Sequence, residues 1–178
     1  MREILFRGFH PSADGKETIF LDGKEIKGEW VEGDIVHGVA EQKGMAFIWS
    51  EKADNPFGCV ERDVIPETVG QFTGMYDSTK WEELTSDEQA LFLYPLEGGT
   101  RSKDDWKGKK IFEGDILDTP DRIVVVTWLD SNAQFDCDFL KYAHDIEIEN
   151  FKGIFPRDFY KYKVIGDIFS NPELLNKN

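Results

Sequence analysis

The stretch Ile123–Leu129, which reads IVVVTWL, decides the fold class of this 178-residue chain. Three consecutive valines follow an isoleucine, and β-branched side chains favour extended backbone because their χ1 angle is already restricted. A run without polar alternation is typical of a strand that is buried on both faces. We therefore predict a central strand here, with Trp128 as part of the core.

Further strand patterns lie on both sides of this run. FDCDFL at 135–140 and DIEIEN at 145–150 alternate apolar and acidic residues, which predicts strands with one buried face. Near the start, EILFRGF at 3–9 and TIFLDG at 18–23 predict an opening hairpin. Short apolar groups from Trp30 onward, separated by glycines, predict a meander of short strands. The chain is thus predicted to be mainly β.

One internal segment has a helical pattern instead. Thr85 and Glu88 have the spacing of a capping box, and Pro95 predicts the end of the helix, so we expect a helix over about 86–94. Near the C-terminus, Asn171–Pro172 supplies a capping residue followed by a proline suited to the first helical position. A second short helix is therefore expected there.

A short Gly-Asp pattern recurs along the chain. Glu-Gly-Asp-Ile occurs at 32–35 and 113–116, and Ile-Gly-Asp-Ile occurs at 165–168. Glycine accepts a positive φ, and aspartate can accept hydrogen bonds from nearby backbone N–H groups. We therefore predict structural turns, and no metal or ligand site, at Gly33, Asp34, Gly114, Asp115, Gly166 and Asp167. The spacing of the residues around the two identical copies differs, which leaves open whether the copies arose by an internal duplication.

Motifs for catalysis or metal binding are absent from the sequence. His10, His37 and His144 form no HxH, HExxH or HxxxH pattern, and Cys59 and Cys137 form no CxxC. Phosphate-binding loops and nucleophile elbows are missing as well. We predict no metal, no cofactor and no enzymatic activity. The alternative is an enzyme with a dispersed site near Cys137 and His144, although acidic neighbours disfavour a reactive thiolate there.

The charge balance is strongly acidic. With 21 Lys+Arg against 35 Asp+Glu, the formal net charge is -14. Such a surface repels phosphate backbones, so direct nucleic-acid binding is not expected. It is either a solvated acidic surface or a nucleic-acid mimic that acts as a decoy for a host DNA-binding protein. The absence of a signal-peptide pattern and of a long apolar window predicts a cytoplasmic protein without membrane contact.

Two tryptophans stand out as candidate binding residues. Trp81 and Trp106 flank the helical segment within otherwise polar sequence. Tryptophan is enriched at interfaces because it combines a large apolar ring with a polar N–H group. We predict that these two side chains either form a contact surface for a partner or dock the helical segment onto the rest of the fold.

Three stretches together resemble the YopX family of bacteriophage and prophage proteins. They are REILFRGF at 2–9, VIPETVGQFTGMYD at 64–77 leading to GKKIFEGDIL at 108–117, and VIGDIFSNPELL at 164–175. Their order matches the family and they frame nearly the whole chain. In that family the Gln-Phe/Tyr-Thr-Gly stretch usually runs almost directly into Gly-Lys-x-Ile-x-Glu-Gly-Asp, whereas here residues 77–107 intervene.

This resemblance implies a phage or prophage accessory protein, with no established activity and no catalytic residues to transfer. We expect a β-rich α+β fold with an N-terminal β region over 1–66. An SH3-like barrel over 67–178 would carry a helical insert at about 77–107, and the two regions would be separate or form a single compact unit. In the barrel, Val69–Thr73 would pair with Lys163–Phe169. Strands near 114–118, 122–129 and 135–140 would complete it.

These observations favour one function over the alternatives. We predict a non-enzymatic module that binds a protein partner, with the host as one source of that partner, and a homo-oligomer is compatible with the sequence. The acidic decoy and the enzyme with a dispersed site remain the alternative hypotheses.

Overall fold

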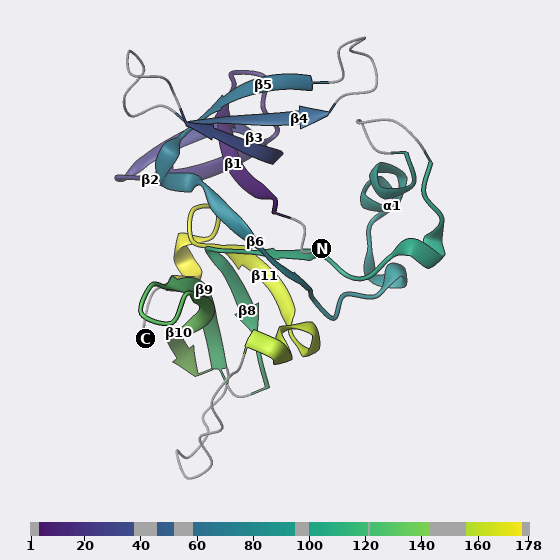
Figure 1. Ribbon diagram of the computed structural model, residues 1–178, viewed down its shortest axis with the longest axis vertical. Coiled ribbons are helices and arrows are strands. Elements are labelled where there is room, and N and C mark those ends of the chain that lie inside the picture. The colour runs from purple at the N-terminus through teal and green to yellow at the C-terminus, as the bar shows by residue number, and fades with distance from the viewer. Residues whose placement is uncertain are drawn as a thin grey trace.

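The computed structural model describes residues 4–37, 46–51, 59–94, 100–120, 122–142 and 156–175. Within these ranges the chain is mainly β, as predicted, and forms two antiparallel sheets (Figure 1). The strands are β1 (Phe6–Pro11), β2 (Glu17–Leu21), β3 (Lys24–His37), β4 (Ala46–Glu51), β5 (Cys59–Val64), β6 (Gly70–Tyr76), β7 (Lys110–Phe112), β8 (Asp115–Asp118), β9 (Arg122–Leu129), β10 (Gln134–Tyr142) and β11 (Lys163–Asp167). Besides α1 (Ser86–Leu93), the helical turns are of the 3-10 type: Pro66–Thr68, Trp81–Glu83, Lys103–Asp105, Pro156–Lys161 and Pro172–Leu175.

The first sheet has the order β5-β4-β3-β1-β6-β7, and β2 also pairs with β3. The predicted hairpin between the first two strands is wrong, because β1 and β2 both pair with β3, at residues 28–33 and 24–28. The hairpin is formed by β2 and β3 instead. Asp22 and Gly23 have φ values of 50° and 73°, and two residues with positive φ make the turn whose twist suits a hairpin.

Strand β3 runs without interruption through Gly33 and Asp34, so the turn predicted at this pair is wrong. Gly33 pairs with Phe6 of β1, and Asp34 pairs with Trp49 of β4. A methyl group on Gly33 would overlap the carbonyl oxygen of Trp49. The glycine is therefore needed for close backbone approach between strands and not for a change of chain direction. Beyond it, β3, β4 and β5 are consecutive antiparallel neighbours, as a meander requires.

The second sheet has the order β10-β9-β8-β11. It confirms the three strands predicted near 114–118, 122–129 and 135–140, and Val124–Val126 are all buried. The predicted pairing of 69–73 with 163–169 is wrong, since β6 pairs with β1 and β7 whereas β11 pairs with β8. The β7–β8 hairpin therefore contributes one strand to each sheet, because β7 pairs with β6 and β8 pairs with β11. The described strands form two open sheets, and a closed SH3-like barrel is not confirmed.

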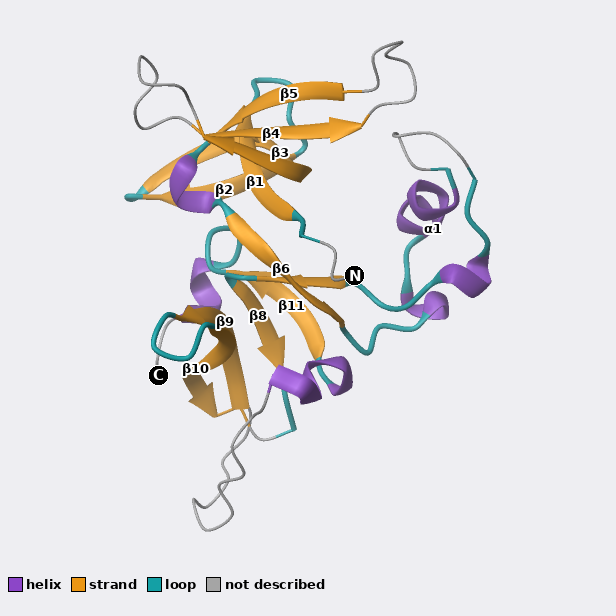
Figure 2. Cartoon of the chain, viewed as in Figure 1, coloured by secondary structure: helices purple, strands orange, loops and turns teal. Residues whose placement is uncertain are grey.

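Each sheet region has a hydrophobic core of its own. One cluster contains Ile111, Leu117, Val124, Val126, Phe135 and Phe159, and the other contains Ala46, Ile48 and Val64. Strand β6 runs from one sheet region toward the other (Figure 2). Trp128 was predicted in the core but is 37% exposed and packs edge-on against Phe135. The predicted strand at 145–150 lies outside the described residues.

Helix α1 confirms the capping box in the sequence. Thr85 Oγ1 accepts a hydrogen bond from the Glu88 N–H, and the Glu88 carboxylate accepts one from the Thr85 N–H at 2.8 Å. The short C-terminal helix is confirmed as the 3-10 turn Pro172–Leu175. The division at residue 66 stays a prediction, although β6 and β7 extend the N-terminal sheet past it. Among the described helices, none is long and apolar enough to cross a bilayer.

Candidate functional site

An ion pair joins the two sheets at their junction. The Arg7 Nη2 on β1 donates to the Asp115 Oδ1 at the start of β8 over 2.6 Å. The Arg7 guanidinium also lies 4.6 Å from the Trp30 ring centroid and 4.7 Å from that of Phe112. A carboxylate and two aromatic faces therefore hold one cation. We call Arg7, Trp30, Phe112, Asp115 and Phe169 the seam, because Phe169 packs on Trp30 from the C-terminal side.

Asp115 is only 1% exposed. Burial raises the pKa of its carboxyl to about 6, while the charge of Arg7 and the hydrogen bond from the Phe112 N–H oppose this shift. The carboxyl is thus ionised at neutral pH, in agreement with the hydrogen bonds that its two oxygens accept from Arg7 and Phe112.

The other predicted turn residues have different environments. Gly114 has a φ of 86° and makes the β7–β8 turn, which the Asp115 side chain closes. Gly166 lies at an irregularity in β11, and the Asp167 carboxylate accepts hydrogen bonds from the Phe169 and Ser170 N–H groups at 2.9 and 2.8 Å. The Glu-Gly-Asp-Ile tetrapeptide is therefore extended in one copy and turned in the other.

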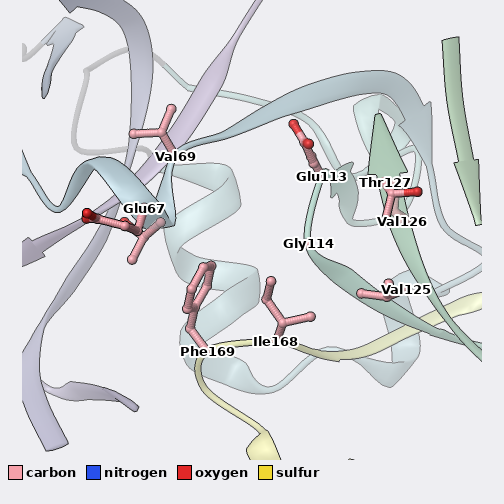
Figure 3. A pocket seen from close by; sticks show the side chains of 10 residues that line it. Glu67, Val69, Glu113, Gly114, Val125, Val126, Thr127, Ile168 and Phe169 are labelled. Carbon is pink, nitrogen blue, oxygen red and sulfur yellow. The ribbon is translucent and has the colours of Figure 1, made fainter. Parts of the chain in front are cut away.

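A hollow of about 160 Å³ opens beside the seam (Figure 3). Its walls come from the 3-10 turn before β6, the β7–β8 turn, β9 and the segment after β11. We call it the seam hollow; it is lined by Glu67, Thr68, Val69, Glu113, Gly114, Val125, Val126, Thr127, Ile168 and Phe169. Both sheet regions thus contribute to one concave surface.

Backbone hydrogen bonds fix the walls of the seam hollow. The Gly114 N–H donates to the Val126 carbonyl over 2.8 Å, and the Gly114 carbonyl accepts from the Ile168 N–H over 3.0 Å. The Phe169 carbonyl accepts from the Phe20 N–H over 2.8 Å. The hollow is therefore formed before any ligand arrives, which lowers the ordering cost of binding.

The structure brings the two predicted binding residues together. Trp81 and Trp106 have ring centroids 6.1 Å apart, and both contact Phe92 of α1, at 5.7 and 5.1 Å. The Trp106 indole N–H donates to the Thr79 carbonyl over 2.9 Å. Both tryptophans are half-buried in this cluster, so part of each ring packs within the segment itself. Their role in binding stays a prediction.

Sequence reasoning missed the residue that holds the base of this segment. Asp77 is 3% exposed, and its carboxylate accepts hydrogen bonds from the Thr79 N–H and hydroxyl, the Lys109 N–H and the Val164 N–H. We call residues 78–108 the insert, since Asp77 and Lys109 flank it. The Asp77-Ser-Thr sequence was the available signal, because an aspartate in such a stretch commonly accepts a hydrogen bond from the backbone N–H two residues ahead.

Residues 100–176 match the family model described as YopX protein. This match supports a YopX family assignment, and we call these residues the YopX part. The YopX part contains β7 to β11, and with them Asp115, Asp167 and most of the seam hollow. The N-terminal sheet up to β6 and helix α1 lie outside the matched residues. No curated protein sequence matches the chain.

Cys137, in the YopX part, was the centre of the alternative enzyme hypothesis. It is half-buried on β10 against the core, and burial together with Asp136 and Asp138 raises the pKa of its thiol to about 12. Its suggested partner His144 lies outside the described residues. Within those residues, no group of three or more His, Cys, Asp or Glu side chains is placed to hold a metal ion.

We expect Cys137 to react slowly with iodoacetamide at pH 8, because almost none of its thiol is ionised there. The reaction is measured by mass spectrometry in a Cys59→Ser variant, so that only one thiol contributes. In urea the same thiol should react at least tenfold faster. Native Cys137 reacting as fast as the unfolded thiol would contradict the expectation and favour the alternative enzyme hypothesis.

The capping residue Glu88 makes the insert sensitive to acid. The hydrogen bond from the Lys109 ammonium, followed by that from the Thr85 N–H, lowers the pKa of Glu88 from 4.5 to about 2. The stabilisation is thus fully present above pH 4.5 and is lost as pH falls toward 2. We expect the indole N–H NMR signal of Trp106 to shift across this window in the wild type.

The variant Glu88→Gln isolates this effect. It should perturb the Trp106 signal already at pH 6 and abolish its dependence on pH between 4.5 and 2. Glu25→Gln, on the distant β2–β3 hairpin, should leave the acid transition unchanged. An unaltered transition in Glu88→Gln would show that another carboxylate controls the insert.

Proposed function

We propose that this protein is a non-enzymatic accessory protein of phage or prophage origin that binds a partner protein in the bacterial cytoplasm. The observation that supports this function is the exposure of helix α1. No residue of α1 is buried, although its sequence is rich in apolar side chains. Leu91 is 55% exposed, and Tyr94 directly after the helix is 66% exposed.

The position of α1 suits an external contact. Figure 1 shows the helix beside the two sheets and not between them. The aromatic cluster and the ion pairs Lys109–Glu88 and Lys103–Glu82 hold the insert in shape at 2.9 and 2.7 Å. A helix ordered in advance can place Leu91 and Tyr94 in a groove of a partner with little entropic cost.

The negative charge of α1 and of the whole chain indicates which class of partner protein fits the helix. The first turn of α1 carries Asp87 and Glu88, and the whole chain has a formal charge of -14. A partner with an apolar groove bordered by basic side chains is complementary to this surface, and opposite charges speed the encounter. We propose such a basic partner from the host or the phage.

The test is an affinity capture from a lysate of the host, followed by reconstitution with the purified captured protein. Leu91→Ser combined with Tyr94→Ser should weaken binding at least tenfold, and replacing residues 78–108 with Asn-Gly should abolish it. Tyr160→Ser, a change at another exposed aromatic (55% exposed) on a different element, should bind like the wild type. Capture that is independent of the insert would overturn the proposal.

The acidic decoy is the second candidate function, and the formal charge of -14 favours it. A nucleic-acid mimic occupies the DNA site of its target, so double-stranded DNA should displace the captured protein completely. Binding that survives saturating DNA would exclude the decoy and retain the groove-binding function. Light scattering of the purified protein tests whether the partner is a second copy of this chain.

A further inference from the structure

We propose that the seam hollow binds an apolar side chain of a partner segment in which lysine or arginine residues flank that side chain. This inference rests on the proposed function, because it gives the partner protein a second and chemically defined contact. The contact lies within reach of both sheet regions and does not use the insert.

The wall chemistry fits an apolar anchor. Val69, Val125, Ile168 and Phe169 supply aliphatic and aromatic surface from both sheet regions. The volume of about 160 Å³ is close to that of the apolar protein cavities that accommodate a benzene-sized molecule, at about 150 Å³. One leucine-sized side chain is therefore the matching occupant, and its burial supplies the favourable term.

The carboxylates at the rim of the seam hollow are complementary to basic residues near the anchoring side chain of the partner. Glu67 and Glu113 lie on different sides of the seam hollow, and Figure 3 shows both carboxylates directed outward from its apolar floor. Among the described residues, neither carboxylate forms an ion pair; the nearby pairs are Arg7–Asp115 and Lys110–Glu32. In a strand-like segment, residues two positions before and two positions after the anchor share its face, so basic residues there would place one positive charge near each glutamate.

The seam explains why this site keeps its shape. Asp115 holds the β7–β8 turn through Phe112, and Asp167 holds the segment that carries Phe169. The Gly114 N–H and carbonyl are both used in hydrogen bonds to the opposite walls. A peptide therefore meets a rigid hollow, which is the condition for measurable affinity from a short segment.

The probe is the peptide acetyl-Lys-Gly-Leu-Gly-Lys-amide, titrated into the ¹⁵N-labelled full chain at low salt. Amide signals of Val69, Gly114 and Ile168 should shift with saturation. The peptides with Gly in place of Leu, or with Glu in place of both Lys, should bind at least fivefold more weakly. Equal affinity of the Gly peptide would overturn the anchor, and equal affinity of the Glu peptide would overturn the charge match.

Protein variants complete the test. Glu67→Gln combined with Glu113→Gln should weaken binding of the Lys-Gly-Leu-Gly-Lys peptide at least fivefold, whereas Glu25→Gln with Glu29→Gln, an equal charge change at exposed sites of β3, should change affinity less than twofold. Equal weakening by both double substitutions would show that the net charge of the protein controls peptide binding, and it would overturn the proposed site. The variant with residues 78–108 replaced should still bind the peptide, so the failure of this site and the failure of the insert as a binding element are separate results.

Discussion

Asp115→Ala is expected to lower the free energy of unfolding by about 3–5 kcal/mol, the range found when one partner of a buried ion pair is removed. The Arg7 side chain is only 16% exposed and would remain between Trp30 and Phe112 without its counter-ion. The Phe112 N–H would lose its acceptor as well. Urea denaturation at pH 7.5, followed by tryptophan fluorescence, measures the effect.

Two further variants separate charge from packing. Asp115→Asn keeps an acceptor for the Phe112 N–H and should be less damaging than Asp115→Ala. Arg7→Met combined with Asp115→Leu replaces the pair with apolar groups and should be more stable than either Arg7→Met or Asp115→Ala alone. A loss below about 1 kcal/mol for Asp115→Ala would mean that the pair behaves like an exposed one.

Asp77→Ala is expected to have the second large effect, about 3 kcal/mol, because an unpaired buried polar group costs about 1–3 kcal/mol and several donors lose one acceptor together. These donors are the N–H groups of Thr79, Lys109 and Val164. The insert should also become more susceptible to proteolysis, since its two ends lose their common anchor. Urea denaturation and limited proteolysis measure the two consequences.

The controls for Asp77 test the importance of its acceptor atoms. Asp77→Asn retains one carbonyl oxygen and should preserve more of the stability. Glu82→Gln removes only an exposed ion pair with Lys103 and should cost less than about 1 kcal/mol. If cleavage within the insert is equally fast in wild type and Asp77→Ala, the insert is held by other contacts.

Local patterns predicted the elements well. The valine run of β9, the alternation of β10 and the capping box of α1 each depend on residues a few positions apart. The resemblance to the YopX family was confirmed for residues 100–176. Interactions at such short range can be read from sequence because backbone geometry fixes which neighbours share a face.

Long-range contacts were the part that the sequence did not reveal. Arg7 and Asp115 are 108 positions apart, and nothing near either residue indicates the other. Gly33 and Gly114 have the same neighbours, Glu before and Asp-Ile after, but the first lies against β4 and the second turns the chain. The seam and its hollow depend on how two sheets meet, and only tertiary packing determines that arrangement.

The closed base of the insert has an evolutionary consequence. The Asp77 N–H donates to the Lys109 carbonyl over 2.8 Å, so the chain leaves the β6–β7 hairpin and re-enters it at adjoining positions. Because loop-closure entropy depends only weakly on loop length, replacing residues 78–108 with a shorter or longer sequence should leave both sheets intact. The connection between β6 and β7 can therefore be replaced during evolution without loss of the fold. The surface that the insert presents can thus change while the two sheets and the seam keep their structure.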